Sequence, residues 1–199
     1  VLGGYLLSRR NWMFQRILAL SVIFTMYFSG GLIPFYLTVR ELQLDNTLWS
    51  LIIPTAISTY NMIIMRTAFA AIPDSLEESA KLDGASHFVI LTKIMVPLVV
   101  PTIAVLVLYY GVGHWNAWFN AMIFLRDRSK YPLQLILREI LIQNSLNDMT
   151  LGAGMDDKEM IAETIKYAVI VVSTVPILCL YPFLQKYFVK GVMIGAVKG

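Results

Sequence analysis

A short acidic stretch, from Ile72 to Ala85, contains the residues whose types and spacing best suit a specific interaction. Its ionisable side chains belong to Asp74, Glu77, Glu78, Lys81 and Asp83. Asp74 and Glu77 have the spacing of a capping box and predict a helix that begins there, and Gly84 suits the left-handed position just past a helix end. Such a helix would either present its charges to a partner or be an ordinary solvated connector, and the residue types favour neither.

Motifs for catalysis do not occur in the sequence. A phosphate-binding loop of the form G-x-x-x-x-G-K-[ST] is absent, and so are H-E-x-x-H and the G-x-S-x-G elbow. His87 and His114 are isolated, and the single cysteine, Cys179, allows neither a disulfide framework nor a thiolate metal cluster. We therefore predict no catalytic residue, no metal site and no cofactor bound by this chain. The basic residues are scattered and the net charge is only +3, so no nucleic acid partner is expected.

The composition is that of a membrane protein. Of the 199 residues, 57% are hydrophobic and 15% are charged, and the mean hydropathy is +0.66. Soluble domains carry about 25% charged residues, so this chain has too little charge for a surface that faces water on all sides. The lipid bilayer is therefore a predicted partner.

Uncharged runs predict four transmembrane helices, since a crossing needs roughly 20 apolar residues. We place the spans at 17–39, 46–65, 94–112 and 167–185. The third comes from an uncharged run that is too long for one crossing, and Gly111 and Gly113 predict a break that ends it. In the first, Gly30 and Gly31 predict a kink or a close helix contact. The expected fold is all-α, a single multi-pass transmembrane domain over residues 1–199.

The basic residues predict the orientation of these spans. Val1–Ser8 is apolar and is followed by Arg9 and Arg10, as at the end of an earlier crossing, so we expect an N-terminally cropped chain. An excess of Lys and Arg in short loops marks the cytoplasmic side. With four crossings, the loop 72–93 that holds the acidic stretch lies inside the cell, and the loop 126–164 lies outside.

The acidic stretch resembles the EAA motif of ABC importer permeases, which runs E-A-A, three residues, G, nine residues, I-x-L-P. The matching residues are Glu78-Ser79-Ala80, Gly84, Ile94 and Pro97. Ser79 replaces the second-position Ala of the motif, and Val96 replaces its Leu. Other features resemble the carbohydrate-uptake branch of the family, the maltose and alginate-oligosaccharide type: Asp83-Gly84-Ala85, Pro97 with Pro101, Trp115-Asn116 and the glycine-rich tail at 190–199.

The resemblance implies a coupling helix, which docks on a cytoplasmic ATPase subunit and transmits its motion. The implied coupling residues are Glu77, Glu78, Ser79, Ala80, Asp83, Gly84, Ala85 and Pro97. Glu78 would contact the ATPase, Gly84 would allow a sharp turn, and Leu76 and Ala80 would hold the helix to the bundle. The implied partners are a second, similar but non-identical permease, an ATPase dimer that holds ATP and Mg, and an extracytoplasmic solute-binding protein. The implied location is the inner membrane of a prokaryotic cell.

Aromatic and amide side chains suggest a substrate path. The candidates are Tyr60, Asn61, Trp115, Asn116, Trp118 and Asn120. Aromatic faces stack on sugar rings and amides bind hydroxyl groups, which fits an apolar pocket with a few polar groups. Two other interpretations are equally open, because tryptophans form interfacial belts and polar residues form hydrogen bonds between membrane helices.

The outer loop has helical spacing of its apolar residues over 133–142 and predicts an interfacial helix with Arg138 and Glu139 turned to water. This helix would contact the external binding protein or be a simple connector. We therefore predict a permease for ATP-driven import of carbohydrate, as oligosaccharide. The alternatives are the same architecture for an amino acid or osmolyte, and an ion-coupled carrier, which the absence of ionisable residues from the spans disfavours.

Overall fold

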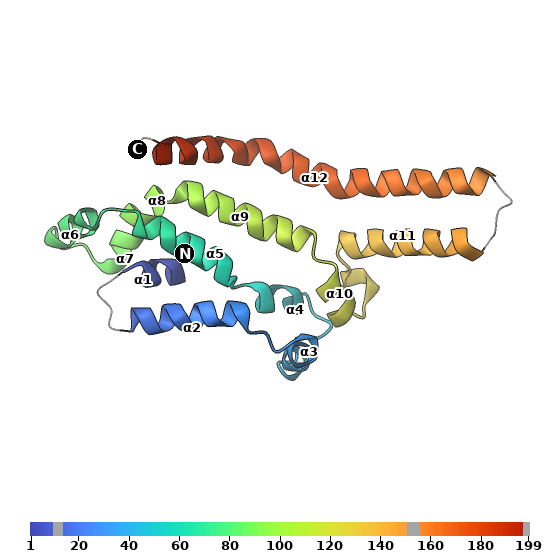
Figure 1. Cartoon of the computed structure of the whole chain (residues 1–199), viewed down its shortest axis with the longest axis horizontal. Coiled ribbons are helices and arrows are strands. Elements are labelled where there is room, and N and C mark those ends of the chain that lie inside the picture. The colour runs from blue at the N-terminus through green and yellow to red at the C-terminus, as the bar shows by residue number, and fades with distance from the viewer. Residues whose placement is uncertain (10–13, 151–155, 197–199) are drawn as a thin grey trace. The chain divides into compact units, whose positions relative to one another are not determined.

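The computed structural model describes residues 1–9, 14–150 and 156–196, and most of them are helical (Figure 1). These ranges contain no strand, which confirms the all-α prediction. The α-helices are α1 (Leu2–Ser8), α2 (Gln15–Tyr27), α3 (Leu32–Glu41), α4 (Trp49–Ile52), α5 (Thr59–Ala70), α6 (Asp74–Leu82), α7 (His87–Val89), α8 (Val96–Leu98), α9 (Val100–Trp115), α10 (Phe119–Phe124), α11 (Leu133–Thr150) and α12 (Asp156–Ala196). The order also includes the 3₁₀ turns η1 (Ile53–Thr55) and η3 (Arg128–Lys130), and the π-helix η2 (Ile90–Met95).

Contacts within the chain divide it into two compact units, which are described separately below. Unit 1 consists of Val1–Gly31, Thr55–Tyr109 and Leu184–Gly199. Unit 2 consists of Leu32–Pro54 and Tyr110–Phe183. The chain passes from one unit to the other more than once, so the units are not two domains in succession. The single domain over 1–199 stays a prediction.

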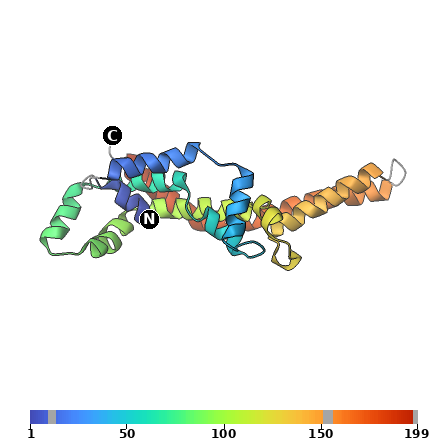
Figure 2. The same cartoon turned by 90° about the horizontal axis from the view of Figure 1, so that it is seen from below.

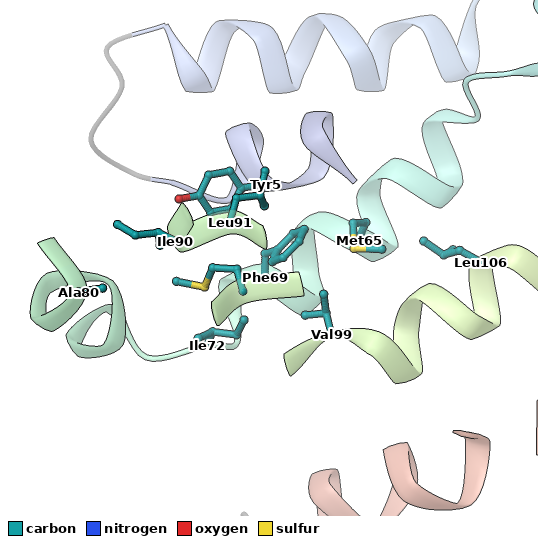
Figure 3. Close-up of a cluster of buried hydrophobic side chains, with 10 residues drawn as sticks. Tyr5, Met65, Phe69, Ile72, Ala80, Ile90, Leu91, Val99 and Leu106 are labelled. Carbon is teal, nitrogen blue, oxygen red and sulfur yellow. The ribbon is translucent and has the colours of Figure 1, made fainter. Parts of the chain in front are cut away.

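The core of unit 1 joins α6 to helices on either side of it in the sequence. Figure 3 shows Tyr5 of α1, Phe69 of α5, Ala80 of α6 and Leu106 of α9 in one cluster of buried side chains. The ring of Phe69 is fully buried and meets the ring of Tyr5 edge-on, with 5.6 Å between centroids. The other members are Met65, Ile72, Ile90, Leu91, Met95 and Val99. α6 is therefore packed onto its own unit through Ala80.

The helix α1 lies close against α5 because α1 carries two glycines at the contact. A Cβ atom on Gly4 would lie 2.6 Å from Met65 Cγ, and one on Gly3 would lie 2.7 Å from Met62 Sδ. At Gly3 the flexible Met62 side chain can move away, but at Gly4 the backbone nitrogen of Arg66 is also only 3.1 Å away, so Gly4 is the position that requires glycine. The apolar segment at the start of the chain is thus a fixed part of unit 1.

The runs predicted as the first two spans are not continuous helices. In the run 17–39, α2 ends at Tyr27 and α3 begins at Leu32, and between them Gly31 has a φ of +85°. A residue with positive φ leaves the right-handed helix, so the glycines predicted to cause a kink cause a complete break. In the run 46–65, the short α4 and the turn η1 come first, and α5 begins only at Thr59. At its start the hydroxyl of Ser58 accepts a hydrogen bond from the backbone N–H of Asn61.

The run 94–112 is also interrupted, at a different place from the prediction. The helical segment that ends at Leu98 is bent by 80° relative to α9. Pro101 explains this bend, because proline lacks an N–H group and its ring clashes with the carbonyl four residues earlier. The predicted break at Gly111 and Gly113 is wrong, since α9 continues through both to Trp115. A glycine costs a helix only about 1 kcal/mol relative to alanine, and this apolar helix tolerates two.

The run 167–185 lies inside α12. Among the described residues, α12 is the one helix that is long and apolar enough by itself to cross a membrane, over Glu163–Pro182 with a mean hydropathy of 1.8. Two bent helix pairs, α2 with α3 and α7–α8 with α9, pass the same test when each pair is taken together, which brings the total to at most three. The number of crossings therefore stays a prediction.

Unit 2 is built around α10, which packs on α4 and α11. Ala121, Leu125 and Leu135 form its buried cluster. Asn46 connects two loops, because its side-chain Oδ1 accepts hydrogen bonds from the backbone N–H groups of Arg126 and Asp127, each at 3.1 Å. The helix predicted over 133–142 exists and is longer, since α11 continues to Thr150.

Candidate functional site

The acidic stretch forms the helix α6, as the sequence predicts, but the predicted capping box does not. The N-cap residue is Pro73, so Asp74 is the first helical residue and not the cap. The carboxylates of Asp74 and Glu77 lie in the first turn, where they face the positive end of the helix dipole. Figure 2 shows α6 and α7, in green, as an arm of unit 1 that extends beyond α5.

The end of α6 has the geometry that its glycine predicts. Gly84 has a φ of +78°. Its N–H donates to the carbonyl of Lys81, and the N–H of Ala85 donates to the carbonyl of Ala80, both at 3.0 Å. These two bonds form a Schellman motif, in which the left-handed residue satisfies the last helical carbonyls. The motif reverses the chain at Gly84 without leaving those carbonyls unpaired.

The inner face of α6 is held by an ion pair that the sequence motifs do not predict. Glu77 is only 7% exposed, and its Oε2 lies 2.7 Å from Nη1 of Arg9. Its Oε1 lies 2.9 Å from Nζ of Lys81, and this hydrogen bond raises the pKa of the exposed Lys81 ammonium. The expectation that the helix presents all of its charges to a partner or to solvent is therefore wrong for Glu77, because its carboxylate is paired inside unit 1.

The guanidinium of Arg9 joins three elements. Arg9 is the residue that follows α1. Its Nη2 donates a hydrogen bond to the carbonyl of Phe69, near the end of α5, at 3.3 Å. Its Nη1 also lies 3.5 Å from Asp74 Oδ1 in α6. Its Cζ lies 5.1 Å from the centre of the Tyr5 ring, within the range of a cation–π contact. In the sequence, Arg9 indicates only the orientation of the spans. Its role was missed because Arg9 and Glu77 are far apart in the chain.

The outer face of α6 is available for a partner. Glu78, Ser79, Asp83 and Gly84 are exposed, and among the described residues no ion pair includes Glu78 or Asp83. Leu82 is 89% exposed. A polar rim beside exposed apolar side chains is typical of a protein interface.

Three further residues of the predicted coupling set and its neighbourhood have clear positions. Leu76 is 43% exposed, so the expectation that it holds α6 to the bundle is wrong, and of these two apolar residues only Ala80 is buried. Ala85 is half-buried against the core cluster. Pro97 is exposed in α8, directly after the π-helix.

The predicted substrate-path residues fall into different units. Tyr60 and Asn61 lie in α5 of unit 1, where Tyr60 is 55% exposed and Asn61 is buried. The others, Trp115, Asn116, Trp118 and Asn120, belong to unit 2. A single path lined by these six residues therefore stays a prediction.

Both tryptophans of the predicted path have partners within unit 2. The indole Nε1 of Trp115 donates to the carbonyl of Ser173 in α12 at 2.9 Å. The guanidinium Cζ of Arg138 lies 3.2 Å from the centre of the Trp118 ring. Arg138 was predicted to face water and instead covers this ring, while Glu139 accepts a hydrogen bond from Arg128 at 3.3 Å. One face of Trp118 is therefore already occupied.

The whole pattern of helices and motifs matches a known family. The model of the family described as "Binding-protein-dependent transport system inner membrane component" matches residues 1–194. The chain belongs to this family. The resemblance of the acidic stretch to the motif of importer permeases is confirmed. The arm formed by α6 and α7 is part of an inner membrane transport component.

Relatives of this inner membrane component carry transport names. The polygalacturonan/rhamnogalacturonan transport system permease protein of Bacillus subtilis is 47% identical over 100% of this chain and 69% of its own length. The maltodextrin transport system permease protein of Streptococcus pneumoniae is 30% identical over 100% of this chain and 68% of its own length. The chain thus spans about two thirds of the length of these relatives.

A solved structure shares the fold. It is a bacterial ABC transporter involved in the import of the acidic polysaccharide alginate, and it matches with a TM-score of 0.80 and 34% sequence identity. The match covers 94% of this chain and 66% of that chain. The fold of this inner membrane component is therefore that of an ABC importer permease.

Proposed function

We propose that this chain is one transmembrane half of an ATP-driven, binding-protein-dependent importer, and that α6 is its coupling helix. The observation that carries the proposal is the division of α6 into two faces. Glu77 and Ala80 are buried in unit 1, whereas Glu78 and Leu82 are exposed at the end of the same helix. A helix that is fixed on one face and open on the other can receive a displacement from a partner and pass it inward.

The partner on the open face would be a separate ATPase dimer that holds ATP and Mg. Glu78, Ser79 and Asp83 would supply polar contacts, and Gly84 would let the ATPase approach the turn closely. Closure of the dimer on ATP would displace α6, and the core cluster around Phe69 would carry the displacement to α5 and α9. Residues that pack as one cluster move together, because a packed core is not continuously deformable.

The other proposed partners complete an importer. They are a second permease that is similar but not identical, and a solute-binding protein that meets the outer segment, including α11. We place the chain in the inner membrane of a prokaryotic cell as a multi-pass protein, with α6 on the cytoplasmic side. The family description, which names a binding protein and the inner membrane, supports this arrangement.

The proposed substrate is a carbohydrate, in the form of an oligosaccharide. The relatives and the solved structure are named for polygalacturonan, maltodextrin and alginate, all of which are polysaccharides or their fragments. The path would use the amides of Asn61, Asn116 and Asn120 and the ring of Tyr60. Trp115 and Trp118 would shape this path through their contacts with α12 and Arg138.

A substitution at Gly84 tests the coupling role in the assembled transporter. Gly84→Trp adds bulk at the turn and forces a left-handed conformation on a residue with a Cβ atom, which costs about 1–2 kcal/mol. We expect normal insertion into the membrane and loss of ATP-dependent oligosaccharide uptake in proteoliposomes that contain the ATPase and the binding protein. Gly111→Trp is the matched control, because its Cβ would also meet open space but its φ is not positive.

Three outcomes of this experiment would contradict the proposal. Normal uptake by Gly84→Trp would remove the coupling role of α6. Stimulation of ATP hydrolysis by an amino acid or osmolyte, and not by saccharides, would replace the substrate class. Uptake by the wild-type protein under an ion gradient without ATP would identify an ion-coupled carrier.

A further inference from the structure

We propose that Arg9 is a positioning residue of the transport cycle, which fastens the coupling helix α6 to the cytoplasmic ends of α1 and α5 through Glu77. The inference rests on the proposed function of α6. It concerns a second, inward-facing contact, on a different side of the helix from the proposed ATPase contact. Through this contact, displacement of α6 becomes displacement of α1 and α5.

The first step is the burial of the pair. The side chain of Arg9 is 17% exposed and that of Glu77 is 9% exposed, and their closest atoms lie 2.7 Å apart. Opposite charges at this separation and degree of burial attract strongly, because little water lies between them to screen the interaction. Ala80, the other buried residue of α6, makes only a small apolar contact. The orientation of α6 is therefore set mainly by Arg9.

The second step is that Arg9 itself is firmly anchored. The backbone of α1 is pressed onto α5 at Gly3 and Gly4, and Nε of Arg66 donates to the carbonyl of Leu7 at 3.1 Å. Arg9 in turn donates to the carbonyl of Phe69 at 3.3 Å. Each arginine thus satisfies a carbonyl near the end of the other helix, and the two helix ends are held together from both sides.

The third step is the difference between two adjacent carboxylates. Successive residues in an α-helix point about 100° apart, since there are 3.6 residues per turn. Glu77 consequently points into unit 1 toward Arg9, while Glu78 is exposed. A partner that pushes on Glu78 would displace α6, and Glu77, on the adjacent side of the helix, would transmit this displacement to Arg9. This arrangement assigns the two carboxylates separate tasks, docking for Glu78 and transmission for Glu77.

The test uses the full-length protein in its complex with the second permease, the ATPase and the binding protein in proteoliposomes. The measured quantity is the amount of oligosaccharide imported per ATP hydrolysed. For Arg9→Ala and Glu77→Ala we expect the complex to assemble and to hydrolyse ATP, with import per ATP lowered by roughly tenfold, within the range by which connecting residues change coupling. The double variant should lose no more than either single variant.

Lys81→Ala is the matched control, because Lys81 is the other ionic partner of Glu77 and is exposed. It leaves the contact between Arg9 and Glu77 in place, so import per ATP should stay at the wild-type value. Where Arg9→Ala fails to accumulate in the membrane, Arg9→Lys takes its place. A lysine keeps the charge but cannot reach Glu77 and the Phe69 carbonyl together as the forked guanidinium does, so it should also lower import per ATP.

A distance measurement gives a readout that does not depend on transport. Spin labels at Thr67 of α5 and Ser79 of α6, both exposed, are introduced after replacement of the native Cys179 by serine. Arg9→Ala should broaden the distribution of distances between the labels, and Lys81→Ala should leave it narrow.

The failures of the two proposals are distinguishable. Import that needs no ATP in the wild-type protein overturns the proposed function. Wild-type import that depends on ATP, together with unchanged import per ATP in Arg9→Ala or Arg9→Lys, overturns the role of Arg9 alone. An unchanged distance distribution in Arg9→Ala also overturns it.

Discussion

At the scale of single residues, the central feature is the pair of neighbouring glutamates in α6. Glu77 is 7% exposed and lies between Arg9 and Lys81, whereas Glu78 is exposed. A buried carboxylate contributes to folding through its partners, and loss of its charge leaves the partly buried Arg9 with only the more distant, exposed Asp74 as a counter-charge. An exposed carboxylate away from any ion pair contributes little to stability. The two positions should therefore separate stability from function.

Glu77→Gln and Glu78→Gln form a matched pair that tests this separation. Glu77→Gln should lower the free energy of unfolding in detergent by about 1–3 kcal/mol, because the charged partner of Arg9 and Lys81 is lost. Glu78→Gln should change it by less than about 0.5 kcal/mol and should weaken binding of the ATPase. Thermal unfolding and co-purification with the ATPase measure the two effects. Equal loss of stability in both variants would contradict the assignment of the two faces.

At the scale of elements, close packing of α1 on α5 holds together the two helices to which Arg9 connects α6. Gly4 lies where a Cβ atom would be 2.6 Å from Met65 Cγ and 3.1 Å from the backbone nitrogen of Arg66. Because a backbone atom is among these neighbours, a rotamer change of Met65 alone cannot make room. Arg66 also bonds to the end of α1, so separation of the helices would disturb Arg9 as well.

Gly4→Ala should therefore destabilise the protein, by about 1–3 kcal/mol as for other overpacked positions. Gly111→Ala is the control, because its Cβ would have nothing within 4 Å. That substitution should leave stability unchanged or raise it by about 0.4–1 kcal/mol, since alanine restricts the unfolded chain more than glycine does. Thermal unfolding of both variants in the same detergent is the measurement. Equal midpoints for Gly4→Ala and the wild type would show that α1 does not lie this close to α5.

At the scale of the whole molecule, the helices of the described residues depart from a simple row of straight spans. α12 alone is long and apolar enough to cross unaided, and two other candidates are bent pairs. Broken helices occur in transporters where neighbouring helices, side chains or water satisfy the freed backbone groups. The exposed apolar side chains of α2, α9 and α12 give these helices the lipid-compatible surface that a bundle in a membrane needs.

The orientation of the chain gives a prediction at this scale. With four crossings, Ser79 in α6 faces the cytoplasm and Ser129 in the loop before α11 faces the outside. Single cysteines at these exposed positions, in a protein with Cys179 replaced by serine, should react with an impermeant maleimide from opposite sides. Ser129→Cys should react in intact cells, and Ser79→Cys only after the membrane is opened. Reaction of both from the same side would contradict the four-crossing topology.

The sequence by itself determined the all-α class, the family and the C-terminal end of α6. Residue types and short spacings are sufficient to predict these features. A left-handed turn requires a residue such as Gly84, and the low content of charged residues indicates a chain that does not face water on all sides. The positions of helix breaks were less predictable, because the effect of a proline or glycine on a helix depends on the residues that surround it. Pro101 bends a helix by removing a hydrogen bond, whereas Gly111 and Gly113 remain helical in α9.

Only the tertiary structure decided which charges of α6 are buried and which are exposed. Leu76 and Ala80 follow the same apolar spacing, yet Ala80 is buried and Leu76 is 43% exposed. Glu77 and Glu78 are chemically identical, and their difference arises from Arg9, which folding brings 2.7 Å from Glu77 across 68 positions of the chain. The physical reason is that burial and ion pairing depend on groups distant in sequence, whereas helix formation and turn conformation depend on residues a few positions apart.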